Sequence, residues 1–233
     1  MVPGARLVVL GKQGSGKGTQ CVRLSHRYVL PHISTGDMLR VEVKSRSPLG
    51  LEARRYLDAG DLIPDEVVLA MVADRLDRDD TRTRGFVLDG FPRTVAQADG
   101  FDELLKPAEI DLVLNLVIPT ELVLARLVSR RVCEDCAAIY STYAPPKVNW
   151  TCDVCGGEVV QREDDTEEAI KNRLELYESS TAPLIARYAA LDKLVDVSGV
   201  GSPDEVNRGL TSVIDAYQHG GGFFPPVPSE ERS

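Results

Sequence analysis

The 233-residue chain lacks a long apolar run and an excess of positive charge. Its richest apolar stretch, residues 112 to 128, is interrupted by Asn115, Pro119, Glu121 and Arg126, whereas a membrane span needs about 20 predominantly apolar residues. No charged segment followed by an apolar core stands at the N-terminus, so we expect no signal peptide. The formal net charge of -9 argues against nucleic acid or an anionic membrane as a partner. We therefore expect a cytoplasmic protein.

Cysteine and histidine are also scarce, with five and three residues. Four of the cysteines form two C-x-x-C pairs, Cys133 with Cys136 and Cys152 with Cys155. In a cytosolic protein this spacing indicates a metal site before disulfides, and four thiolates predict a closed, structural Zn2+ site. Iron is an alternative ion and a redox dithiol an alternative role. Cys21 stands alone and is expected in the core.

Glycine is concentrated in residues 11 to 19, which read GKQGSGKGT and follow the apolar run 7 to 10. Glycine allows successive N–H groups to converge on phosphate oxygens, and Lys17 adds a charge. The hydroxyl residue that follows the lysine in the usual loop comes one place later here, at Thr19, because Gly18 follows Lys17. The segment predicts a nucleoside triphosphate site but leaves the reaction open.

The apolar pattern predicts an α/β fold with a doubly wound parallel sheet, because continuous apolar runs alternate with helical periodicity. Residues 34 to 63 and 129 to 165 do not fit this alternation and are expected to be insertions at the carboxyl ends of strands, where ligands bind. Ser202, Pro203 and Glu205 predict the start of a last helix, followed by a flexible tail over residues 218–233. The predicted strands are 7–10, 86–88, 112–117 and 194–197.

The apolar run at 86 to 88 ends in the segment DGFPR, residues 89 to 93. Asp89 at the end of a buried strand can hold Mg2+ or its bound water. Arg93 can grip phosphate through two parallel hydrogen bonds. This segment therefore predicts phosphoryl-transfer chemistry beside the glycine loop.

Three motifs, GKQGSGKGT, ISTGDMLR at 33 to 40 and DGFPR, occur in this order, and the paired cysteines lie between RLVSRR and QREDD. With these motifs the chain resembles the adenylate kinase family, in its long-lid, zinc-containing bacterial form, over about residues 6 to 217. The resemblance implies a P-loop core with a five-stranded sheet, made of residues 1–33, 64–128 and 166–217. It also implies a small helical insertion that binds a nucleoside monophosphate (34–63) and a zinc-ribbon-like lid (129–165).

The resemblance implies that a monomer transfers a phosphoryl group reversibly, with Mg2+, from ATP to AMP to give two ADP. On the ATP side it implies Gly14, Ser15, Gly16, Lys17, Gly18, Thr19, Arg126, Arg130, Ile139, Tyr140 and Gly201. On the AMP side it implies Thr35, Arg40, Asp61, Leu62, Ile63, Gly90, Phe91, Pro92, Arg93 and Gln97, with Arg162 and Arg173 reaching the transferring phosphates. The implied catalytic set is Lys17, Asp89, Arg93, Arg130, Arg162 and Arg173.

Three other functions stay open at this point. The first is a related kinase that uses GTP as donor or UMP or CMP as acceptor. Thr35 and Gln97 favour adenine at the acceptor site, because the Gln97 amide can pair with the edge of adenine through both its donor and its acceptor group. The second is a zinc-ribbon nucleic-acid binder regulated by ATP, and the third is a P-loop ATPase or switch with water as acceptor. Gln13 and Ser15 depart from the family's usual proline and alanine, and neither is expected to touch the chemistry.

Overall fold

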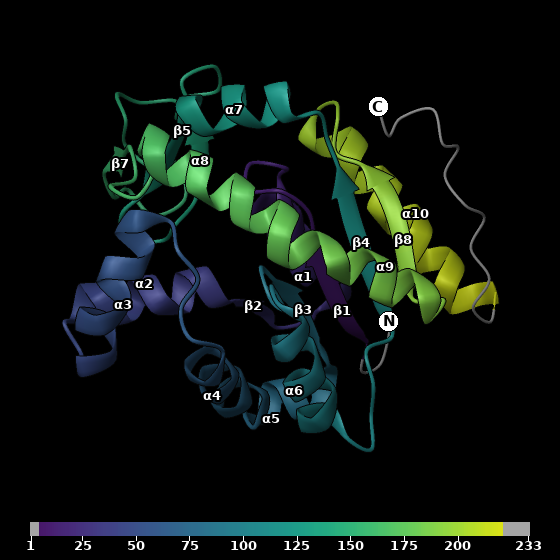
Figure 1. The fold of residues 1–233 in the computed structure, drawn as a ribbon. Helices are drawn as coiled ribbons and strands as arrows, with labels where there is room; N and C mark the ends of the chain where they lie inside the picture. Colours follow the sequence, from purple (N-terminus) through teal and green to yellow (C-terminus); the bar gives the residue numbers. More distant parts are fainter. Residues whose placement is uncertain (1–4, 221–233) are drawn as a thin grey trace.

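The computed structural model describes residues 5–220. A five-stranded sheet forms its centre, in the order β2-β3-β1-β4-β8 and with every neighbouring pair parallel (Figure 1). The predicted doubly wound five-stranded sheet is therefore confirmed. The strands are β1 (Arg6–Leu10), β2 (His32–Ser34), β3 (Phe86–Asp89), β4 (Leu112–Val117) and β8 (Leu194–Ser198).

Helices cover both faces of this sheet, because successive side chains of each strand point to opposite sides. Leu7 and Val9 of β1 pack into one apolar cluster and Val8 and Leu10 into the other. The first cluster includes α1 and α10, and the second includes α4, α6 and α9. The helices are α1 (Lys17–Tyr28), α2 (Thr35–Ser45), α3 (Pro48–Ala59), α4 (Asp65–Leu76), α5 (Asp79–Arg84), α6 (Val95–Leu105), α7 (Thr120–Ser129), α8 (Glu167–Leu176), the π-helical turn η1 (Tyr177–Thr181), α9 (Ala182–Ala190) and α10 (Pro203–Gly220).

Two segments stand outside the layered part. The helical insertion, residues 34–63, contains α2 and α3. The cysteine segment, residues 129–165, carries an antiparallel sheet of order β6-β5-β7, made of β5 (Arg130–Cys133), β6 (Ile139–Ser141) and β7 (Val159–Val160). The two segments touch, since Lys44 Nζ of α2 donates to the carbonyl oxygen of Glu134 at 3.2 Å. Both segments lie beside α8 in Figure 1.

The last helix begins as predicted and ends later than predicted. Glu205 N donates to Ser202 Oγ at 3.3 Å, and Ser202 N donates to Glu205 Oε2 at 2.7 Å, which forms a capping box. The helix continues to Gly220, so the tail predicted over 218–233 starts too early by three residues. Residues 221–233 of that prediction lie outside the described part of the chain. Among the described residues, no helix has the length and apolar character needed to cross a membrane.

Candidate active site

The loop between β1 and α1 curls around its own lysine. Gly14 and Gly16 have φ values of 83° and 98°, a region that residues other than glycine rarely adopt. Lys17 Nζ donates to the carbonyl oxygens of Gly11 at 2.6 Å and Lys12 at 2.8 Å. The lysine therefore supports the loop from inside and places its charge beside the backbone of residues 11 and 12. Thr19 lies in the first turn of that helix.

Asp89, the last residue of β3, lies close to the position that follows the lysine. A Cβ atom added to Gly18 would stand 3.3 Å from Asp89 Oδ2, so a side chain at this position would press on the carboxylate. His32 Nε2 lies 3.7 Å from the same oxygen. His32 is the first residue of β2. Burial lowers the pKa of Lys17 to about 8, and the charge of Asp89 opposes this shift.

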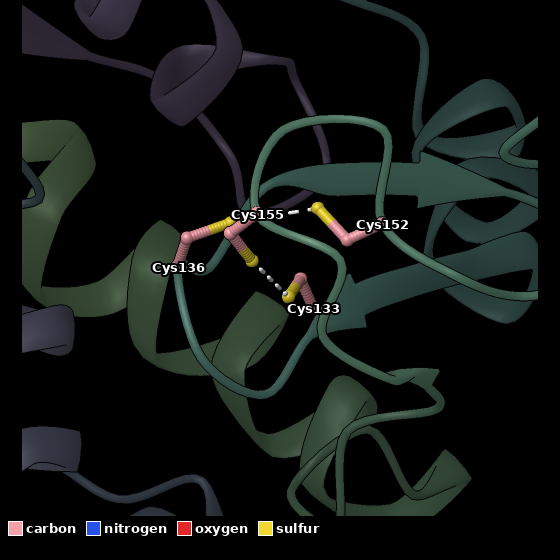
Figure 2. A group of neighbouring side chains, drawn as sticks. All are labelled: Cys133, Cys136, Cys152 and Cys155. Atoms are coloured by element: carbon pink, nitrogen blue, oxygen red, sulfur yellow. Dashed lines mark hydrogen bonds between the residues drawn. The ribbon is translucent and has the colours of Figure 1, made fainter.

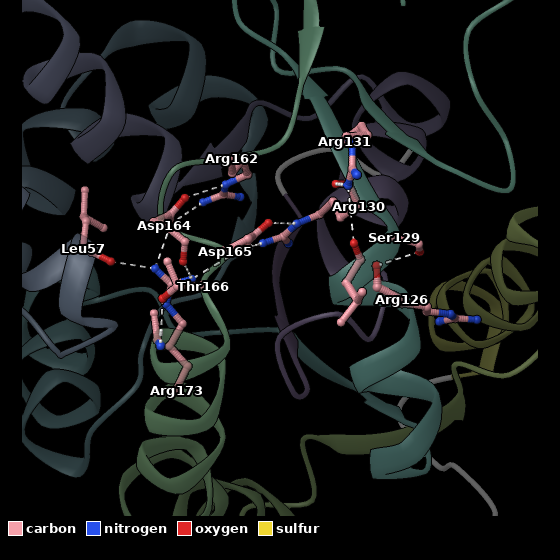
Figure 3. A network of polar contacts seen from close by, with 12 residues as sticks. Leu57, Arg126, Ser129, Arg130, Arg131, Arg162, Asp164, Asp165, Thr166 and Arg173 are labelled. Carbon is pink, nitrogen blue, oxygen red and sulfur yellow. Dashed lines mark hydrogen bonds and ion pairs between the residues drawn. The ribbon is translucent and has the colours of Figure 1, made fainter.

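Three arginines gather around two adjacent buried carboxylates (Figure 3). Arg130 Nε donates to Asp165 Oδ2 at 2.8 Å. Arg162 donates to both oxygens of Asp164, at 2.9 and 2.8 Å, and Arg173 Nη2 donates to Asp164 Oδ2 at 2.7 Å. The two acidic side chains are only 10% and 0% exposed. Residues from β5, from the segment after β7 and from α8 thus form one charged cluster.

This cluster carries more positive than negative charge. Burial by itself would raise the pKa of the Asp164 carboxyl, but Arg162 and Arg173 outweigh burial and hold that pKa below its ordinary value. Burial also lowers the pKa of Arg93 to about 10, and the charges of Arg173, Arg40 and Arg162 act in the same direction. A chain of net charge -9 therefore concentrates cations at one place, as a phosphate site requires.

Residues of the DGFPR segment meet the helical insertion at one carbonyl group. Thr35 Oγ1 donates to the carbonyl oxygen of Gly90 at 3.1 Å, and Arg93 Nε donates to the same oxygen at 2.7 Å. Gly90 has a φ of 74°. The side chains of Phe91 and Pro92 are buried, so these two residues can offer a ligand little more than their backbone.

Gln97 is held at both ends of its amide. Its Oε1 accepts from Arg93 N at 2.8 Å, and its Nε2 donates to Asp65 Oδ1 at 2.8 Å. One lone pair and one N–H group remain for a base. Asp65 was not predicted as a site residue. Its second oxygen accepts from Thr94 Oγ1 at 2.9 Å. Asp65 begins α4 two residues after Ile63, and this closeness to the predicted AMP segment was the one feature of the sequence that could have indicated it.

The remaining residues predicted on the AMP side lie along the helical insertion. Arg40 forms an ion pair with Asp37 on the same helix, and burial lowers the pKa of Arg40, with the charge of Arg162 acting in the same direction. Asp61 Oδ1 accepts from Asn172 Nδ2 at 2.6 Å. Leu62 is half-buried and Ile63 is buried. The segment 61–63 therefore connects α3 to the core beside α8.

Arg126 links the glycine loop to Gly201. Its Nη1 donates to the carbonyl oxygen of Ser15 at 3.3 Å and its Nη2 to that of Gly201 at 3.5 Å. Three residues predicted on the ATP side are thus brought together. Ile139 Cδ1 lies 3.4 Å from the position of a Cβ on Gly18, so β6 reaches the glycine loop. The Tyr140 hydroxyl instead lies 3.4 Å from Cys152 Sγ, which turns its ring toward the cysteines.

The four paired cysteines form one cluster (Figure 2). Cys133 Sγ lies 3.4 Å from Cys155 Sγ, and Cys136 Sγ lies 3.5 Å from Cys152 Sγ. All four sulfur atoms lie within 4.8 Å of one another, and none of the four forms a disulfide. Zn–S bonds of about 2.3 Å in a tetrahedron place sulfur atoms about 3.8 Å apart. The cluster could therefore hold Zn2+ with four thiolates, without an open position.

Gln13, which departs from the family pattern, contacts the arginine cluster. With its amide oxygen assigned toward the guanidinium groups, Gln13 accepts from Arg130 Nη2 and Arg173 Nη1, both at 3.0 Å. The glycine loop carries this side chain to arginines that lie more than one hundred residues away in the chain. Sequence spacing contains no signal for such a contact.

Comparisons with known proteins agree with this geometry. A family model described as adenylate kinase matches residues 9–193. Curated adenylate kinases include one from Thermodesulfovibrio yellowstonii, 48% identical over 213 residues that cover 90% of this chain and 99% of that protein. Another, from Clostridium botulinum, is 47% identical over 90% of this chain and 98% of that protein. One from Caldicellulosiruptor bescii is 50% identical over 83% and 91%. The chain therefore belongs to the adenylate kinase family.

Proposed function

We propose that the chain catalyses reversible, Mg2+-dependent phosphoryl transfer from ATP to AMP, giving two ADP. The observation that carries this assignment is the convergence of Lys17, Arg93 and the arginine cluster around Asp164 and Asp165 at one edge of the sheet. Phosphoryl transfer needs little covalent chemistry from the protein and much positioning and charge stabilisation. Arginine guanidinium groups that are held in place by hydrogen bonds supply both positioning and charge stabilisation.

The ATP side of the proposed site is the glycine loop with its neighbours. The N–H groups of residues 14 to 19 and Lys17 would bind the phosphates, while Arg126 and Gly201 border the donor nucleotide. Bound Mg2+ would neutralise charge on the phosphate oxygens. Asp89 is the residue that would hold this ion or its water. Arg130, Ile139 and Tyr140 would complete this side from the cysteine segment.

The AMP side is formed by the helical insertion and the DGFPR segment. Thr35, Arg40, the backbone of 61–63, Gly90 to Arg93 and Gln97 would bind the acceptor. The phosphate oxygen of AMP is already ionised and can attack directly, so no general base is required. Arg162 and Arg173 would stabilise the phosphoryl group in transit.

Water is the competing acceptor, and the two segments outside the core can exclude it. We propose that residues 1–33, 64–128 and 166–217 form the core, that 34–63 is the monophosphate-binding insertion and that 129–165 is the lid. The contact between Lys44 and Glu134 spans the two segments. Closure of this kind completes the site and keeps water from ATP.

Structural Zn2+ held by Cys133, Cys136, Cys152 and Cys155 is proposed to stabilise the lid. A segment of this size buries too little apolar surface to be stable alone. Among the described residues, the buried apolar cluster of this segment consists of only Cys133, Cys152 and Val159, with Ala138 and Tyr140 partly buried beside them. A metal therefore replaces the missing apolar core.

Family membership also supports a monomer that acts in the cytoplasm. The net charge of -9 opposes binding to nucleic acid or to an anionic membrane. Size-exclusion chromatography with light scattering tests the monomer. Salt-dependent retention on a nucleic-acid column would contradict this part of the proposal.

One assay tests the central proposal. Purified protein receives ATP and Mg2+ with AMP, GMP, CMP or UMP in turn, and diphosphate formation is followed. We expect fast ADP production with AMP alone. Fast turnover with a pyrimidine nucleotide and slow turnover with AMP would contradict the acceptor assignment, and phosphate release without any acceptor would favour an ATPase.

A further inference from the structure

The C-terminal end of α3 is bound to α8 by side-chain donors from two consecutive residues. Asn172 Nδ2 donates to the carbonyl oxygen of Ala59 at 3.0 Å and to Asp61 Oδ1 at 2.6 Å. Arg173 Nη2 donates to the carbonyl oxygen of Leu57 at 2.8 Å. The side-chain amide of Asn172 in α8 therefore donates one hydrogen bond to the residue before Gly60 and one to the residue after it.

Gly60 brings the two helices into close contact at this point. Its φ is 76°, and it caps α3 in the left-handed conformation. A Cβ atom at this position would stand 2.5 Å from the carbonyl oxygen of Ala169, so the backbone of α3 lies directly against the backbone of α8. The path of the chain after α3 is thus set by α8.

Residues 61 to 63 follow directly and are fixed at their other end by the core. Ile63 is buried in the same apolar cluster as Leu39 and Val68. The segment is therefore held by Asn172 at its start and by apolar packing at its end. A short segment fixed at both ends presents its backbone groups in one orientation.

We propose that Asn172 is a positioning residue for the acceptor nucleotide, which orients the backbone of 61–63 toward the base of AMP. The inference rests on the proposed function, in which this backbone borders the acceptor. Arg173, the next residue of α8, belongs to the phosphate-binding cluster. Because Asn172 and Arg173 share one helix, the base-binding segment and a phosphate-binding arginine keep a constant separation.

Substitution of Asn172 tests this role through separate kinetic constants. We expect Asn172→Ala to raise KM for AMP about tenfold, the effect of losing one to two hydrogen bonds. Turnover at saturation and KM for ATP should stay within about twofold, because the amide touches neither the loop around Lys17 nor the arginine cluster. Lys171→Gln, at an exposed neighbour on the same helix, is the matched control and should leave all three constants unchanged.

A charge variant separates positioning from general loss of packing. Asn172→Asp places a carboxylate against Asp61 and the carbonyl of Ala59, so it should raise KM for AMP more than Asn172→Ala does. Adding Asp61→Asn restores a donor facing that carboxylate and should recover part of the loss. Rescue by a second charge change would not occur if Asn172 only filled space.

Calorimetric binding of AMP without ATP gives the readout that does not depend on turnover. The proposal predicts weaker AMP binding in Asn172→Ala, together with faster hydrogen exchange at amides 61–63. Equal losses for AMP and ATP, or a fall in turnover with KM for AMP unchanged, would overturn it. If a variant unfolds, Asn172→Ser, which keeps one donor, supplies the same comparison. If the unsubstituted protein fails to phosphorylate AMP at all, the proposed function is wrong, and the exchange and binding data still decide whether Asn172 orients the segment.

Discussion

Arg130 and Asp165 face each other through two hydrogen bonds, and the Asp165 side chain is fully buried. Removing one partner of such a pair leaves an uncompensated charge out of water. The pair joins β5, at the start of the cysteine segment, to the last residue of that segment, two residues before α8. It therefore fixes the orientation of one arginine of the proposed transfer site.

Asp165→Asn should lower the free energy of unfolding by about 3–5 kcal/mol, because the Arg130 guanidinium loses its buried counterion. Denaturant titration followed by circular dichroism measures this change. Glu163→Gln, at a side chain that is 87% exposed, is the control and should change stability by less than about 1 kcal/mol. A loss as small as the control's would show that the pair is not important for stability.

Arg93→Ala should reduce turnover far more than it weakens ATP binding. Arg93 is anchored to Gly90 and Gln97, on the acceptor side, and loss of one charge-stabilising donor lowers turnover by about 100- to 1000-fold. Steady-state kinetics with AMP and calorimetry with ATP separate the two effects. Arg131→Ala, which removes a side chain bonded to the backbone of its own segment, should be much milder. Equal losses in turnover and ATP affinity would contradict the placement of Arg93.

Gln13→Leu should lower turnover about tenfold or more, because Arg130 and Arg173 lose a common hydrogen-bond acceptor, and hydrogen bonds to charged groups contribute about 1.5–3 kcal/mol. Gln13→Glu should act differently and raise KM for ATP, since a carboxylate would compete with phosphate for both arginines. Steady-state kinetics of the two variants provide the comparison. If turnover and KM for ATP in both variants equal those of the unsubstituted protein, this contact has no part in catalysis.

ATP binding should take up protons near pH 8.5. Lys17 has a pKa of about 8 without ligand, so much of it is neutral at this pH, and phosphate favours its charged form. Calorimetry in two buffers with different ionisation enthalpies measures the uptake. Lys17→Arg, which stays charged, should abolish it. Unchanged uptake in that variant would assign the proton to another group.

The same pKa affects stability in a defined direction. The unfolded chain keeps the Lys17 proton up to about pH 10.4, whereas the folded protein releases it near pH 8. Between these values the unfolded state binds more protons, so this group's contribution to the free energy of unfolding rises with pH. Between pH 7.5 and 9.5, the free energy of unfolding should therefore rise more, or fall less, in the unsubstituted protein than in Lys17→Met. Denaturant titration of both proteins at the two pH values measures this difference. An identical pH dependence in both would contradict the shifted pKa.

Removal of metal should loosen the cysteine segment before the rest of the protein. The four sulfur atoms there could hold a metal ion beside few buried apolar residues, and a closed four-thiolate site supplies folding free energy when the metal binds. Hydrogen exchange after chelation should show lost protection over residues 130–160 and retained protection in β1 and β4. Retained protection throughout would mean that the segment does not depend on metal.

Features that depend on a short contiguous segment could be predicted from sequence. The glycine loop is an example, because Gly14 and Gly16 permit the positive φ values that the loop adopts. The capping box of Ser202 and Glu205 is another, because its bonds span three residues. Strand β2 was not among the predicted apolar runs, since it has only three residues and two of them, His32 and Ser34, are polar.

The sequence by itself determined the alternation of strands and helices, the glycine loop and the two cysteine pairs, because each follows from local backbone preference or ligand spacing. Only the tertiary structure decided which arginine meets which carboxylate, that Gln13 faces Arg130 and Arg173, and that Asn172 holds the end of α3. These contacts join residues far apart in the chain. Their partners are chosen by the packing of whole helices, which side-chain spacing along the sequence does not encode.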